Sequence, residues 1–77
     1  MTHYYVLEDH PQQQQRLQQI IGACQLFDQP ALLLAALQAD RQPKVILIDL
    51  ALHHVVHAGL NVAQAIRSFD SLSPIII

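Results

Sequence analysis

The fold of this chain is decided by the stretch Lys44-Val45-Ile46-Leu47-Ile48-Asp49-Leu50. Four consecutive residues in it are aliphatic, so the alternation of apolar and polar side chains that marks a half-buried strand is absent. A strand that is apolar on both faces is usually a parallel strand covered by helices on both sides. Asp49 then stands at the carboxyl end of the strand, where open α/β sheets bind ligands. The plain alternative is an aspartate that only begins the next loop.

Length and composition set the limits of the interpretation. The chain has 77 residues, enough for one small domain, and its hydrophobic content of 52% argues against disorder. The net charge of -2 offers no basic surface for nucleic acid and no polybasic membrane patch. The single cysteine, Cys24, fits a reducing cytosol, and no apolar run approaches the ~20 residues of a membrane span. Since no signal peptide is visible either, we expect a cytoplasmic location.

Short apolar segments alternate with segments of helical periodicity along the chain. The predicted strands are residues 3–7, 23–27, 44–48 and 75–77. The predicted helices begin at His10-Pro11 and end at Gly22, follow Asp28-Gln29-Pro30 through Ala31–Gln38, and run from about Leu60 to Phe69. Residues 50–59 are predicted to form a loop that ends at a flexible glycine, Gly59.

This alternation implies a parallel sheet wrapped by helices, in a three-layer α/β/α fold. The short strands and tight connections indicate a flavodoxin-like domain with strand order 2-1-3-4-5, of which the chain reaches the fourth strand. In that order the first and third strands are neighbours. Their carboxyl ends carry Glu8-Asp9 and Asp49, so we expect three carboxylates to converge at one edge of the sheet.

Three carboxylates in one small cleft repel each other, and a cation relieves the repulsion. Hard oxygen ligands completed by water suit Mg²⁺, and the backbone carbonyl of Ala51 could add a ligand to Glu8, Asp9 and Asp49. With the metal bound, the Asp49 carboxylate could attack a phosphoryl group as a nucleophile. The alternative is three acids that cap three loops.

At these residues the sequence resembles the receiver domain of a two-component response regulator. The matching segments are Tyr4–Leu7 with Glu8-Asp9, Val45–Ile48 with Asp49, Gly59-Leu60, and Pro74–Ile77. The resemblance implies that Glu8 and Asp9 are Mg²⁺ ligands and that Asp49 accepts a phosphoryl group from a sensor histidine kinase. It thus implies a phosphorelay protein that regulates transcription, not a turnover enzyme.

Several features are similar to one branch of that family, the quorum-sensing regulators of peptide-pheromone and bacteriocin operons. The loop Leu50–Ala58 is long and lacks the methionine-proline turn of most receivers. The segments Glu8–Pro11 and Ala65–Asp70 also match that branch. The resemblance implies a LytTR-type DNA-binding domain as effector, and a second receiver copy as a dimer partner. DNA would be contacted only through that effector domain, which residues 1–77 do not include.

The family also has features that residues 1–77 lack. In the family, strand four leads into a phosphate-sensing Ser or Thr, and a fifth strand carries a phosphate-binding Lys. We therefore expect residues 1–77 to be a partial receiver domain, the N-terminal part of a response regulator. Lys44 precedes the third strand and lies at the opposite edge, so it cannot replace that lysine.

Two other functions remain open. His53, His54 and His57 form a cluster in which the first and last would share a face if they lay on a helix, as zinc-ligand pairs do. The metalloprotease pattern needs Glu at His54, so the general base is absent and a polar loop surface is the simpler interpretation. The other alternative is a receiver-like module that binds a kinase or another receiver without being phosphorylated.

Overall fold

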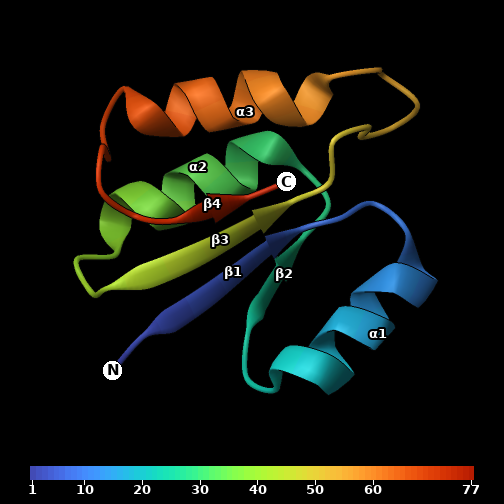
Figure 1. The fold of residues 1–77 in the computed structure, drawn as a ribbon, viewed down its shortest axis with the longest axis horizontal. Coiled ribbons are helices and arrows are strands. Elements are labelled where there is room, and N and C mark those ends of the chain that lie inside the picture. Colours follow the sequence, from blue (N-terminus) through green and yellow to red (C-terminus); the bar gives the residue numbers. More distant parts are fainter.

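A four-stranded parallel sheet and three helices make up the fold in the computed structural model, which describes all 77 residues (Figure 1). The strands are β1 (His3–Leu7), β2 (Gln25–Phe27), β3 (Lys44–Ile48) and β4 (Ile75–Ile76). The helices are α1 (Pro11–Ile21), α2 (Pro30–Ala39) and α3 (Ala58–Arg67). The strand order β2-β1-β3-β4 confirms the predicted α/β class and the flavodoxin-like arrangement of these four strands.

The two central strands, β1 and β3, pair along their whole length. Tyr5 lies opposite Ile46, and Leu7 lies opposite Ile48. These four side chains point to the same face of the sheet, because alternate residues of a strand share a face. That face is the buried one, and its burial fixes the register of β1 against β3. The register in turn determines which residues lie side by side at the common end of the two strands.

Helices α2 and α3 cover this buried face (Figure 1). The core combines β1 and β3 side chains with residues of both helices and one loop residue. Its members are Tyr5, Leu7, Leu33, Leu37, Ile46, Ile48, Leu52, Val62 and Ile66. Prolines at the first turn of α1 and α2 start those helices, as the sequence predicts, although neither helix has a side-chain cap.

The opposite face of the sheet is covered less completely, by α1 alone. The apolar residues Leu17, Ile20 and Ile21 share one face of α1, as their spacing indicates, but none of them is buried, and Ile20 is 74% exposed. The physical reason is that no second helix packs beside α1. Accordingly Val45 and Leu47, on this face of β3, are only half-buried.

The third helix begins two residues earlier than predicted, at Ala58, and ends at Arg67. Val62 and Ile66 face the core as their spacing indicates, but Phe69 lies beyond the helix and is 39% exposed. Gly59 belongs to the first turn of α3 and is buried, so its interpretation as a flexible end of the loop is wrong. No helix of the chain is long and apolar enough to cross a membrane.

Strand β4 forms one edge of the sheet, and its outer backbone groups have no partner strand. Ile76 and Ile77 are 55% and 52% exposed, and neither a charge nor a bulge blocks pairing at this edge. We therefore expect the chain to self-associate at roughly micromolar to millimolar concentration. Sedimentation equilibrium at several concentrations should show a mass that rises above that of the monomer.

The variant Ile76→Lys should return the mass to that of the monomer, because a charge at an edge strand opposes pairing. Leu32→Lys provides a matched control, since Leu32 lies on α2 and is 59% exposed. It adds the same charge away from the edge and should leave self-association unchanged. A wild-type chain that stays monomeric over the whole range would contradict this prediction.

Candidate metal centre

Three carboxylates meet where β1 and β3 end. The ladder continues one residue past each strand, with the N–H of Glu8 donating to the carbonyl of Phe27 and the N–H of Asp49 to that of Leu7, both at 2.9 Å. Oxygens of Glu8, Asp9 and Asp49 all lie within 4.8 Å of one another. The predicted convergence is therefore present in the structure.

Glu8 is the most enclosed of the three acids. It is only 8% exposed, and one carboxylate oxygen accepts a hydrogen bond from the N–H of His10 at 3.3 Å. The side-chain amide of Gln14 donates to the Glu8 carbonyl at 2.6 Å, which ties the first turns of α1 to the end of β1. Burial, together with the neighbouring Asp49 carboxylate, raises the pKa of Glu8. Ionising Glu8 is therefore less favourable than ionising a solvated carboxyl, chiefly because the group is buried.

Asp9 is held by the loop that follows β3. The backbone N–H of His53 donates to Asp9 Oδ2 at 2.9 Å, and this hydrogen bond lowers the pKa of Asp9. The ring of the same histidine contacts the carbonyl of Asp28 through Nε2 at 2.7 Å. Because a carbonyl can only accept, Nε2 carries a proton, and Nδ1 is left 3.9 Å from Asp9 Oδ2. His53 therefore bridges the candidate centre and the end of β2.

The loop between β3 and α3 is compact, not free. Leu52 is 2% exposed and anchors it in the core, and its carbonyl accepts the N–H of Val55 at 2.9 Å. The N–H of Gly59 donates to the carbonyl of Leu50 at 2.8 Å. A Cβ built on Gly59 would lie 2.3 Å from the Asp49 carbonyl oxygen, so the glycine permits close packing of α3 on the strand end.

The histidine cluster does not form the helical ligand pair considered from the sequence. His53, His54 and His57 lie in turns, each with a left-handed φ, of 51°, 64° and 64°. All three are exposed, and the only group of three or more ligand side chains close enough to hold a metal is that of the three acids. Cys24 is half-buried, and burial raises the pKa of its thiol.

The donor set of the acidic cluster fits a hard divalent cation. All its side-chain donors are carboxylate oxygens, which Mg²⁺ and Ca²⁺ prefer. The backbone N–H of Ala51, the residue expected to supply a carbonyl ligand, donates to Asp49 Oδ1 at 3.4 Å. An apolar cavity of about 170 Å³ adjoins Glu8 and Asp49, lined also by Leu17 and Ile76.

Lys44 lies at the other end of the sheet, as predicted. It is the first residue of β3, whereas the acidic cluster follows the last. Since Lys44 is the only lysine of the chain, no lysine side chain lies at the cluster.

No family model, no curated protein and no solved structure matches this chain in comparisons with known proteins.

Proposed function

We propose that residues 1–77 act as a receiver module in a phosphorelay, with Asp49 accepting a phosphoryl group from a sensor histidine kinase. The observation that carries the proposal is the meeting of Glu8, Asp9 and Asp49 within 4.8 Å at the end of β1 and β3. These strands are the neighbours at which an open sheet of this order binds its ligand. The resemblance of these residues to the receiver family agrees with the assignment.

In this proposal Glu8, Asp9 and Asp49, with the Ala51 carbonyl, hold Mg²⁺. When bound, Mg²⁺ supplies positive charge that offsets the acids and the incoming phosphoryl oxygens. A carboxylate oxygen of Asp49 attacks phosphorus, a phosphorus–oxygen bond forms, and the bond from phosphorus to the donor breaks with its electron pair leaving on the donor. The product is an acyl phosphate on Asp49.

The wider role that we propose follows the resemblance. The module would act in the cytoplasm and control transcription through a LytTR-type DNA-binding domain, as quorum-sensing regulators of bacteriocin operons do. The long loop 50–57, which is pinned to the acidic cluster through His53 and Asp9, is the feature of the chain that supports this branch. The same phosphoacceptor chemistry serves other branches, so this finer assignment depends on the effector domain.

A second candidate function is a receiver-like interaction module that is not phosphorylated. Within residues 1–77 no lysine lies at the acidic cluster to pair with phosphoryl oxygens, because Lys44 lies at the opposite end of the sheet. Such a module would bind a kinase or another receiver without forming the acyl phosphate.

Acetyl phosphate tests the two candidates against each other. Incubated with acetyl phosphate and Mg²⁺, the chain should gain one phosphoryl group, which peptide mapping should locate at Asp49. EDTA should suppress the reaction, because the three acids would then repel the donor. Phosphorylation of a residue other than Asp49, or phosphorylation that EDTA does not suppress, would contradict the first proposal. A folded chain that gains no phosphate would favour the second.

A further inference from the structure

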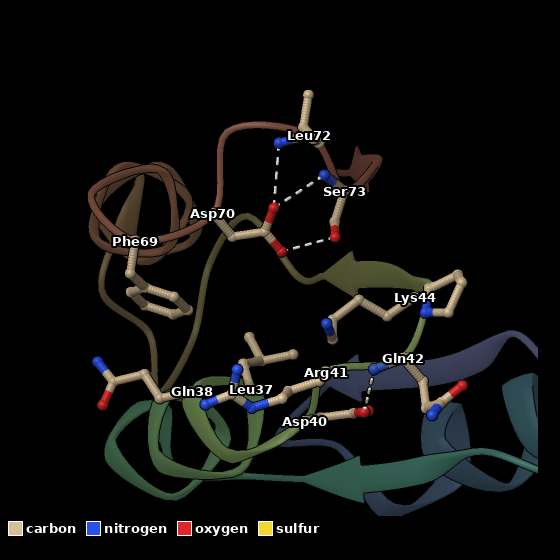
Figure 2. A pocket seen from close by; sticks show the side chains of 11 residues that line it. Leu37, Gln38, Asp40, Arg41, Gln42, Lys44, Phe69, Asp70, Leu72 and Ser73 are labelled. Atoms are coloured by element: carbon tan, nitrogen blue, oxygen red, sulfur yellow. Dashed lines mark hydrogen bonds between the residues drawn. The ribbon is translucent and has the colours of Figure 1, made fainter.

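A cavity of about 500 Å³ opens at the end of the sheet opposite the acidic cluster. Its walls are the turn between α2 and β3 and the segment that leads from α3 to β4 (Figure 2). The volume falls within the range of roughly 300 to 1,000 Å³ that small-molecule sites occupy. This cavity has no role in the proposed phosphorelay.

Lys44 contributes a cation to the cavity from a largely buried side chain. It is 9% exposed, and Figure 2 shows its amine pointing into the space between Asp70 and Arg41. The ammonium makes no ion pair within the chain, whose two ion pairs join histidines to Asp40 and Asp9. Because no buried side-chain nitrogen of the chain lacks a hydrogen-bond partner, the Lys44 ammonium is open to the cavity and not buried. Its three N–H donors therefore face the open space of the cavity and are available for a ligand.

Asp70, the acid above Lys44 in Figure 2, is already engaged by its own turn. Its carboxylate accepts the N–H groups of Leu72 and Ser73 at 3.0 Å each, and the Ser73 hydroxyl at 2.6 Å. These hydrogen bonds, with a smaller contribution from the nearby Lys44 charge, lower the pKa of Asp70 to about 2. The carboxylate thus orders the turn between α3 and β4, and it makes no ion pair with Lys44.

Asp40, the second acid, is turned toward β1. Its carboxylate accepts the Tyr5 hydroxyl at 2.5 Å, the His3 ring N–H at 2.7 Å and the Gln42 N–H at 2.8 Å. The hydrogen bond from Tyr5 is the main reason that the pKa of Asp40 lies well below its usual range. The carboxylate oxygens of both acids therefore already accept hydrogen bonds within the chain. The N–H groups of the two cations of the cavity do not have such partners.

Arg41 is the second unpaired cation of the cavity. It is exposed and makes neither a hydrogen bond nor an ion pair through its guanidinium. Apolar side chains complete the lining, among them Leu37, Phe69 and Leu72. Leu72 is 90% exposed and Phe69 39% exposed, so both present apolar surface to an occupant.

We propose that this cavity binds a small organic oxyanion, a carboxylate or phosphate monoester with a ring-shaped or short apolar body. The oxyanion accepts hydrogen bonds from the Lys44 ammonium and the Arg41 guanidinium, which are the free donors. The body lies against Phe69 and Leu72. This site is independent of Asp49, because it occupies the amino end of β3.

Phenyl phosphate and inorganic phosphate are the probes for this site. In amide NMR spectra of the ¹⁵N-labelled chain at constant ionic strength, phenyl phosphate should cause saturable shifts confined to residues 37–44 and 69–73. Inorganic phosphate should bind about tenfold more weakly, because it lacks the apolar body. Shifts that rise linearly without saturation, or that spread over the surface, would mean charge screening only. Equal affinity for the two probes would contradict the proposal that the ligand has an apolar body that contributes to binding.

Lys44→Met keeps the aliphatic stem and removes the charge. It should weaken phenyl phosphate binding by about tenfold or more, because charge-assisted hydrogen bonds are lost. Arg16→Met is the matched control on α1, outside the cavity, and should bind like the wild type. If Lys44→Met does not fold, Arg41→Gln replaces it, and should weaken binding by about threefold. Unchanged affinity in a folded Lys44→Met or Arg41→Gln chain would overturn the proposal.

Discussion

Replacing Gly59 with alanine is expected to lower the free energy of unfolding by about 2 kcal/mol. The new Cβ would meet the carbonyl oxygen of Asp49 at 2.3 Å and the Cα of Leu50 at 2.9 Å. Both contacts are with backbone, which cannot rotate away as a flexible side chain could. Because Gly59 lies inside α3, helix propensity alone would predict the opposite result, a gain of up to ~1 kcal/mol.

Thermal unfolding followed by circular dichroism measures this effect. The midpoint of Gly59→Ala should fall by roughly 10 °C, since 1 kcal/mol corresponds to about 4–8 °C in a domain of this size. Asn61→Ala is the matched control, because it places alanine on the exposed side of the same helix and should change the midpoint little. A midpoint of Gly59→Ala at or above that of the wild type would refute the steric argument.

The clash would also act on the candidate centre. Asp49 and Gly59 approach through backbone atoms, so relief of the contact must move either α3 or the end of β3. Amide resonances of residues 8, 9 and 49 should therefore shift in Gly59→Ala and stay fixed in Asn61→Ala. The glycine that the sequence presents as a loop end is thus a packing residue of the site.

The sheet was predictable because its signals are local. The run Val45–Ile48 needs burial on both faces, and a proline begins each of the helices α1 and α2. Alternation of these elements leaves few topologies, since parallel crossovers have one preferred hand. Neighbouring positions for β1 and β3 follow from that order, and the meeting of Glu8-Asp9 with Asp49 follows from their positions.

Tertiary contacts explain what the sequence did not reveal. The apolar stripe of α1 predicts a buried face, but burial depends on neighbours, and no second helix shelters Ile20. In the first turn of α3, Gly59 lies close to the backbone of Asp49, a contact that no local pattern records. In both places the periodicity predicted the helix correctly but not the packing around it.

The acidic cluster has one partner that the sequence could not assign. His53 donates its backbone N–H to Asp9, and its ring contacts Asp28, forty-four and twenty-five residues away along the chain. In the sequence it belongs to a histidine cluster whose simpler interpretation is a polar loop surface, yet in the structure it has a left-handed backbone, follows the buried Leu52 and contacts the acids. Only the folded loop places it there.

Asp49→Asn is expected to abolish phosphorylation by acetyl phosphate. The amide keeps the size and shape of the side chain but lacks the charged oxygen that attacks phosphorus. Asp9→Asn should retain the reaction at a rate lowered by about tenfold or more, because it removes a metal ligand and leaves the nucleophile. The measurement is the fraction of phosphorylated chain by intact-mass spectrometry over time, with Mg²⁺ present throughout.

Loss of activity in Asp49→Asn should not come from unfolding. Burial and the Asp49 charge raise the pKa of Glu8 in the folded state, so ionising Glu8 as the pH rises costs stability. Removing the Asp49 charge lessens that cost, and the variant should melt at or above the wild-type temperature at neutral pH. Asp28→Asn, at the exposed end of β2, is the matched control and should be phosphorylated normally. A phosphoryl group that persists in a folded Asp49→Asn chain would place the acceptor on another residue.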